Sequence, residues 1–141
     1  MILRNSYSHP YMTGVVLNYD KSHVSRDGLT YTAVGVDSGW VNFVPWDVTK
    51  MSVGMVHVMH ITGEYSYTAG SWENLMREGD WIATLVKNTQ SQSIWVSNGK
   101  SATIDRAALY TPADWAKVRD MWEAGELADP WFAWDTMPRP D

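Results

Sequence analysis

Apolar and polar residues alternate along much of the chain, and this period of two predicts β-strands with one buried face. The predicted strands cover residues 11–19, 29–36, 40–44, 53–62, 80–87, 93–97 and 100–104. Pro45 directly follows one of these strands and is expected to end it, because proline cannot donate to a sheet. Asn98 and Gly99 separate the last two strands, and they predict a two-residue hairpin turn because both residues tolerate a positive φ.

Two other segments predict helices. Residues 71–79 begin with a serine suited to cap a helix and end with a glycine suited to terminate one. Thr111 and Pro112 predict the start of a second helix, which Gly125 is expected to end. Its apolar stripe consists of Trp115, Val118 and Trp122. We therefore expect an α+β fold: a strongly bent antiparallel sheet or small β-barrel, with a short central helix and one C-terminal helix.

The C-terminal end of the chain has a composition of its own. Residues 126–141 hold three of the six prolines, together with Trp131, Phe132 and Trp134. Proline is unfavourable inside a helix, so this segment is predicted to be extended. Three apolar rings need a surface to cover them, either on the chain itself or at an interface with a neighbouring subunit. The expected organisation is one β-rich domain over residues 1–125 and an extended tail over residues 126–141.

Charge and cysteine content exclude several classes of protein. The chain of 141 residues has 11 basic and 16 acidic residues, a net charge of -5, and no cysteine. Disulfides, thiolate metal sites and a cysteine nucleophile are therefore excluded. Basic residues are not clustered, so we expect no general nucleic-acid binding. Without a membrane-length apolar run or a secretory leader, the expected location is cytoplasmic, or the host cytoplasm if the protein is phage-encoded.

Aromatic residues are the most informative part of the composition. Nine Trp, seven Tyr and two Phe make up 13% of the chain, which is more than a core of this size needs. Some of these rings are therefore expected to line a binding surface or pocket. The ring residues predicted to bind a ligand or partner are Trp40, Trp46, Tyr65, Tyr67, Trp72 and Trp95. Arg77 and Arg106 are the cations expected to contact an anionic ligand.

Two of the four histidines lie in one predicted strand. His57 and His60 are three residues apart, so a strand would place them on opposite faces, where they could not share a metal ion. We therefore predict no metal site and no cofactor. His60 and Thr62 are two residues apart and would share a face. A histidine there can act as a general acid or base, while the hydroxyl binds a phosphate oxygen.

The His60-Ile61-Thr62 triplet resembles the His-x-Thr/Ser motifs of the two-histidine phosphoesterases, which act on cyclic phosphates. His23-Val24-Ser25 is a second triplet of this kind. The resemblance covers six residues, and the triplets are 37 positions apart, closer than two symmetric lobes require. We do not assign the chain to that family. A ribonuclease-like trio can also be composed from His60, Glu64 and either Arg106 or Arg77.

These features favour a non-catalytic binding or inhibitory protein, a small domain of the phage type. Its aromatic-rich surface or pocket would bind a partner protein or a nucleotide-like small ligand. The support is the excess of rings, the low charged fraction of 19% and the lack of a specific catalytic motif. Two alternatives stay open: a small hydrolase or phosphoesterase that uses His60 and Thr62, and a virion or assembly protein whose C-terminal tail holds a homo-oligomer together.

Overall fold

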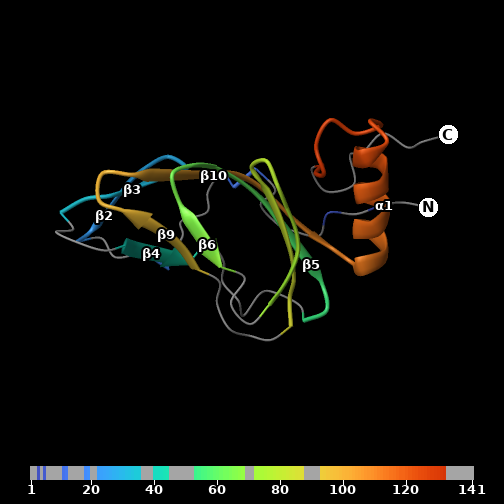
Figure 1. Ribbon diagram of the computed structural model, residues 1–141, viewed down its shortest axis with the longest axis horizontal. Helices are drawn as coiled ribbons and strands as arrows, with labels where there is room; N and C mark the ends of the chain where they lie inside the picture. The colour runs from blue at the N-terminus through green and yellow to red at the C-terminus, as the bar shows by residue number, and fades with distance from the viewer. Residues whose placement is uncertain are drawn as a thin grey trace.

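The computed structural model describes residues 3, 5, 11–12, 18–19, 22–35, 40–44, 53–68, 72–87 and 93–132. For residues 18–19, 40–44, 67–68 and 93 it describes the backbone only. The strands in this part of the chain form two antiparallel sheets, and α1 (Pro112–Glu123) follows the last strand (Figure 1). This arrangement confirms the predicted α+β class.

The larger sheet has six strands and is open rather than closed into a barrel. In spatial order its strands are β2 (Val24–Asp27), β3 (Thr30–Ala33), β10 (Ser101–Tyr110), β5 (Val56–Gly63), β8 (Trp81–Leu85) and β7 (Glu73–Glu78). Strands β2 and β7 form its two edges. The smaller sheet consists of β1 (Asn18–Tyr19), β4 (Trp40–Val44), β9 (Ser93–Ser97) and β6 (Ser66–Thr68).

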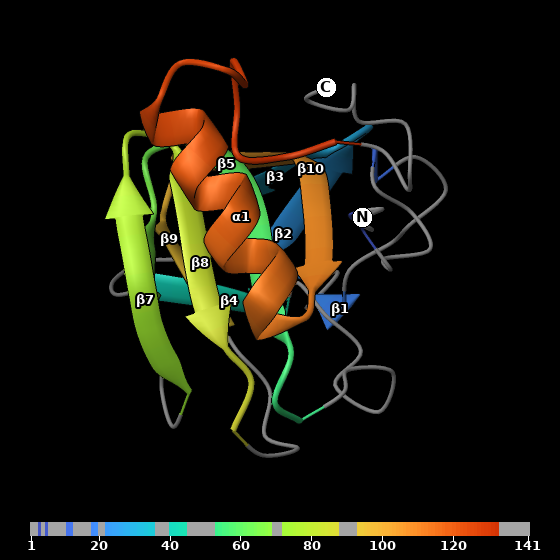
Figure 2. The same ribbon diagram turned by 90° about the vertical axis from the view of Figure 1, so that its right-hand side faces the viewer.

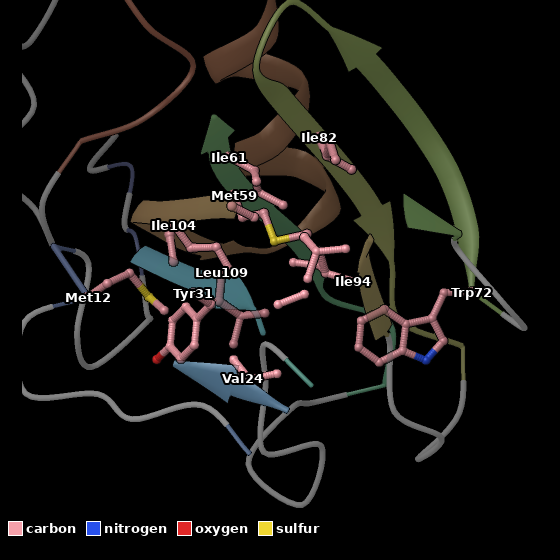
Figure 3. Packing of buried hydrophobic residues seen from close by; sticks show 14 of the residues in the cluster. Met12, Val24, Tyr31, Met59, Ile61, Trp72, Ile82, Ile94, Ile104 and Leu109 are labelled. Carbon is pink, nitrogen blue, oxygen red and sulfur yellow. The ribbon is translucent and has the colours of Figure 1, made fainter. Parts of the chain in front are cut away.

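The six-stranded sheet buries side chains on both faces. On the face toward the smaller sheet, called the inner face, Met59 and Ile104 share an apolar cluster with Ile94 of β9 (Figure 3). On the opposite face, called the outer face, Val58 shares a second cluster with Val118 of α1. Figure 2 shows α1 lying across β5, β8 and β10. The helix therefore covers only part of the outer face.

The central helix predicted over residues 71–79 is wrong. Glu73–Glu78 form strand β7 instead, which pairs with β8 across a tight turn. Gly79 in that turn has a φ of 59°, the left-handed conformation that such turns require. Met76 is buried in the apolar cluster of the outer face. Pairing with β8 and burial of this side chain thus override the good helix propensity of the segment.

The C-terminal helix begins where the sequence predicts. The Thr111 side chain accepts a hydrogen bond from the backbone N–H of Asp114 at 3.2 Å, and Pro112 is the first helical residue. Trp115 and Val118 of the predicted stripe are buried. The third buried residue of the helix is Met121. The expected helix is therefore confirmed, while Trp122 of the predicted stripe is only half-buried beside Met121.

The turn predicted at Asn98 and Gly99 is present, but it does not close a hairpin. The backbone N–H of Lys100 donates to the carbonyl of Ser97 at 2.9 Å, as a tight turn requires. Strand β9 before the turn pairs with β4 and β6, whereas β10 after it pairs with β3 and β5. The turn therefore carries the chain from one sheet to the other.

Strand β10 is longer than its neighbour β3, which pairs only with Ser101–Thr103. Further along β10, the side chain of Asn5 hydrogen-bonds to the backbone. Its Nδ2 donates to the carbonyl of Ala107 at 3.1 Å, and its Oδ1 accepts from the N–H of Leu109 at 3.0 Å. Nδ2 also donates to the carbonyl of Phe132 at 2.8 Å. Asn5 thus joins both ends of the described chain to the sheet.

The first half of the predicted tail lies on the chain's own sheet. Residues 126–132, called the strap, contain no helix or strand. The indole N–H of Trp131 donates to the carbonyl of Ala107 at 2.7 Å, and the Phe132 ring packs 5.6 Å from the Tyr110 ring. Trp131 and Phe132, predicted as interface residues, therefore contact this chain itself. Trp134 lies outside the described residues.

Candidate functional site

A polar cluster lies on the outer face where β5 and β10 pair. His60 of β5 is directly opposite Arg106 of β10. The register shifts between Ile104 and Arg106, so Asp105 is the extra residue of a β-bulge. Ile104 belongs to the inner-face cluster, and in a regular strand Arg106 would share that face. The extra residue of the bulge places Arg106 on the outer face instead. The bulge therefore brings Asp105 and Arg106 together beside His60.

Carboxylates approach both ring nitrogens of His60. Its Nδ1 lies 2.6 Å from Oδ1 of Asp105, and its Nε2 lies 4.0 Å from Oδ2 of Asp80. The imidazole packs on the indole of Trp81, with ring centroids 4.7 Å apart. Since a carboxylate accepts hydrogen bonds, Nδ1 donates to Asp105, which fixes the orientation of the ring. Only 14% of the His60 side chain remains exposed.

Arg106 is already engaged by the chain's own residues. Its guanidinium carbon lies 5.0 Å from the ring centre of Trp81 and 5.7 Å from that of Trp131. Nη1 donates to Oδ2 of Asp129 at 3.0 Å. This combination of cation–π contacts and an ion pair holds the strap on the sheet. Arg106 therefore ties the strap to the sheet.

The cluster as a whole is acidic. We name as the His60 cluster the residues His60, Asp80, Trp81, Asp105, Arg106, Asp129 and Trp131. It contains three carboxylates and one guanidinium, which is paired. The exposed fractions are 59% for Asp80, 40% for Asp105 and 40% for Asp129, against 26% for Arg106. An approaching molecule thus meets carboxylate oxygens before it meets the cation.

Part of the predicted catalytic set is found together. Thr62 lies on the same strand face as His60, and Arg106 lies opposite His60. Glu64, the acid expected in the ribonuclease-like trio, instead forms an ion pair with Lys100 at 3.1 Å. The carboxylates that do flank His60 were not predicted.

Tyr65 and Arg77, both predicted ligand-binding residues, form a separate pair. The guanidinium carbon of Arg77 lies 5.7 Å from the ring centre of Tyr65. Partial burial raises the pKa of Tyr65, and the adjacent Arg77 opposes this rise. Arg77 pairs in register with Ile82, whose side chain lies in the inner-face cluster, so this pair is on the face opposite His60.

The predicted ring residues whose side chains are described are buried or half-buried. Trp72 is buried in the inner-face cluster, and Trp95 is half-buried on β9. Trp40 and Tyr67 lie on β4 and β6, where only the backbone is described, and Trp46 lies outside the described residues. The aromatic contacts at the His60 cluster come instead from Trp81 and Trp131.

His57 and His60 lie on opposite faces of β5, as their spacing predicts. His57 is on the inner face, fully buried, with its ring 6.1 Å from the ring of Trp72. Within the described part of the chain, no three His, Asp or Glu side chains are placed to hold a metal ion. Burial lowers the pKa of His57 from its ordinary value of 6.5 to about 3.

We expect His57 to make the fold sensitive to mild acid. The unfolded chain binds a proton at His57 as the pH falls through 6.5, whereas the folded chain stays neutral there until about pH 3. Stability is therefore full above pH 7 and decreases by about 2 kcal/mol by pH 5. Urea unfolding at the two pH values, for wild type and His57→Gln, measures this loss. The exposed His23→Gln is the control and keeps the wild-type difference; an equal difference in His57→Gln contradicts the assignment.

The bulge at Asp105 explains why sequence reasoning missed the acidic partners of His60. Apolar inner-face positions on β10 are Ala102 and Ile104, then Ala107 and Leu109. This shift from a spacing of two to a spacing of three is the signal that a bulge leaves in a sequence. Asp80 had no comparable signal: the sequence predicted it as the first residue of a strand after a helix, whereas it lies in the turn between β7 and β8.

Comparison with models of protein families, with curated proteins and with solved structures gave no match. Among the described residues, no helix combines the length and apolar character needed to cross a membrane.

Proposed function

We propose that the protein is a non-catalytic binding protein of the inhibitory type, and that it holds a partner protein at the His60 cluster. The observation that supports this proposal is the distribution of charge: two partly exposed carboxylates, Asp80 and Asp105, flank the His60 imidazole, and a third, Asp129, pairs with Arg106. Such a site attracts cationic groups, which are abundant on protein surfaces. Aromatic contacts and the half-buried Arg106 give the site a rigid base.

The same geometry argues against a nucleotide-like ligand. A phosphate needs a cation or several N–H donors, and Arg106 already donates to Asp129. A base also needs an accessible ring face on which to stack. Trp72 and Trp81 are buried, with exposed fractions of 4% and 6%. A partner protein is therefore the better supported of the two ligand classes.

Affinity purification with a matched pair of variants tests the proposal. Wild type, Asp80→Asn/Asp105→Asn and Asp120→Asn/Glu126→Gln are used as baits in lysate from cells that carry the gene. Both double variants remove two negative charges, but Asp120 and Glu126 are exposed residues of α1 and the segment after it. The variant proteins are first shown to melt as wild type does.

We expect a protein that wild type and the Asp120/Glu126 variant retain and the Asp80/Asp105 variant loses. Calorimetry with that purified protein should then show affinity at least about tenfold lower for the Asp80/Asp105 variant. Equal affinity of the two variants, or native mass spectra in which the protein retains a nucleotide instead, would contradict the proposal.

A hydrolase is the second candidate, and the 2.6 Å contact between His60 and Asp105 favours it. A carboxylate that orients an imidazole is a common device in general acid–base catalysis. Thr62 shares the strand face of His60. The test is turnover of cyclic nucleotides by wild type and by His60→Ala: turnover that depends on His60 supports a hydrolase, and its absence supports the binding function.

A further inference from the structure

A row of threonines crosses the outer face beside the His60 cluster. Thr30, Thr103 and Thr62 lie directly opposite one another on the neighbouring strands β3, β10 and β5. The hydroxyls of Thr30 and Thr103 are 2.8 Å apart. All three residues are half-buried, while residues next to them along the strands, Tyr31 and Ile61, belong to the inner-face cluster. We name these three threonines the hydroxyl row.

The hydroxyls on this face offer more acceptors than donors. Each hydroxyl has one proton and two lone pairs, so a bonded pair keeps one proton and three lone pairs. This applies to Thr30 with Thr103, and to Thr32 with Ser101, whose oxygens are 2.7 Å apart. A molecule that lies on this face therefore finds mostly acceptors, and it binds best when it brings N–H donors.

A carboxylate lies at each end of the hydroxyl row. Asp27 of the edge strand β2 is exposed and directly opposite Thr30. Asp80, before β8, accepts from the N–H of Ile61 through its backbone carbonyl, next to Thr62. Within the described part of the chain Asp27 has no ion-pair partner, and the contact of Asp80 is with His60. Both carboxylates are thus available to cations from outside.

Among the described residues, the basic side chains of β10 and its flanking turn do not supply those cations. Lys100 and Arg106 are the basic residues in β10 or directly next to it. Lys100 pairs with Glu64 at 3.1 Å, and Arg106 pairs with Asp129 at 3.0 Å. Figure 1 shows α1 at one end of the molecule and β2 and β3 near the other, so the helix leaves this part of the sheet uncovered.

We propose that an extended, basic segment of the partner protein lies along the hydroxyl row, with one cationic side chain at Asp27 and another at Asp80. This inference rests on the proposed function and specifies its partner. Strands are spaced ~4.8 Å apart, so the four spacings from β2 to β8 span about 19 Å. At ~3.3 Å per residue, the two cations are about six residues apart in an extended chain. The backbone N–H groups and cations of the segment donate to the threonine oxygens.

A synthetic peptide serves as the probe. The sequence Arg-Ser-Gly-Ser-Gly-Ser-Arg with blocked ends is titrated into ¹⁵N-labelled wild-type protein, and the same peptide with Glu in place of Arg is the control. We expect amide shift changes confined to the hydroxyl row and its two ends, and they should weaken as salt is added. Shift changes located elsewhere, or equal binding of the Glu peptide, would overturn the proposal.

Two charge-matched variants locate the contact. Asp27→Lys changes one end of the row, and Asp120→Lys makes the same change at an exposed position of α1. We expect peptide affinity to fall about tenfold in the first variant and to change far less in the second. Equal losses would overturn the proposal.

Binding of the purified protein partner is then measured for Asp27→Lys, for its control Asp120→Lys and for the Asp80→Asn/Asp105→Asn variant. Loss of binding on Asp27→Lys supports the placement along the row. Binding that survives Asp27→Lys, but is lost in the Asp80/Asp105 variant, overturns this placement and leaves the proposed function intact. Binding that survives in both variants overturns the proposed function and the placement with it.

Discussion

Replacing Gly63 by alanine is expected to destabilise the protein by about 3 kcal/mol or more. Gly63 ends β5 with a φ of 113°, which L-residues rarely adopt, and it pairs with Ala102 of β10. A Cβ at Gly63 would overlap the carbonyl oxygen of Ser101, and that oxygen accepts from the N–H of Glu64. Unfavourable φ costs roughly 1–2 kcal/mol, and forced displacement of packed backbone adds about 1–3 kcal/mol.

The Gly35→Ala variant separates the cost of the positive φ from the cost of displacing packed backbone. Gly35 also has a positive φ, 67°, but a Cβ there meets no atom within 4 Å. The free energy of unfolding in urea should therefore fall by about 1 kcal/mol in Gly35→Ala and much further in Gly63→Ala. Equal losses in the two variants would show that β10 does not approach Gly63 as closely as the structure has it.

Local signals predicted elements well where a short segment decides its own conformation. The cap at Thr111, the turn at Asn98 and Gly99 and the end of β4 at Val44 depend on neighbouring residues only, and all three are present. Strand partners were not predictable, because pairing is decided by residues distant in sequence. Residues 71–79 show this clearly: their propensity favours a helix, yet pairing with β8 makes Glu73–Glu78 a strand.

Only part of the candidate site was predicted, because the rest depends on pairing between residues that are distant in sequence. The period of two placed His60 and Thr62 on one face of a strand, and it placed His57 on the other. Arg106 was chosen as a cation for an anionic ligand, but its position opposite His60 and its pairing with Asp129 follow from the fold. Asp105 reaches His60 because of a bulge. The period of two does not predict which face a residue occupies once a bulge interrupts the strand.

The difference between the site predicted from the sequence and the site in the fold changes the ligand that we propose. The sequence left both a partner protein and a nucleotide-like ligand open, and it offered Arg106 as a cation for an anionic ligand. In the fold, the strap covers Arg106 from one side, and Trp81 is buried beneath it. Acidic residues that are far apart in the sequence share the outer face because β2, β10 and the turn before β8 belong to one sheet. The acidic character of the outer face thus comes from residues that the sheet brings together, and no single sequence motif contains them.

Asn5→Ala is expected to cost about 3–5 kcal/mol of stability, because it removes partners from several buried backbone groups. The Asn5 side chain accepts from Leu109 and donates to the carbonyls of Ala107 and Phe132. No part of the Asn5 residue is exposed, so water cannot replace these bonds without opening the structure. Urea unfolding measures the loss, and hydrogen exchange should show faster exchange of the Leu109 amide.

Two further variants establish the cause of that loss. Asn74→Ala removes an exposed asparagine from edge strand β7 and should change stability by less than about 0.5 kcal/mol. Trp131→Phe removes only the indole donor to Ala107 and should cost about 1 kcal/mol, because Asn5 still donates to that carbonyl. If Asn5→Ala were as stable as Asn74→Ala, the two ends of the chain would not be held on β10. Arg106 would then lose the strap that occupies it, and its guanidinium could bind an external anion.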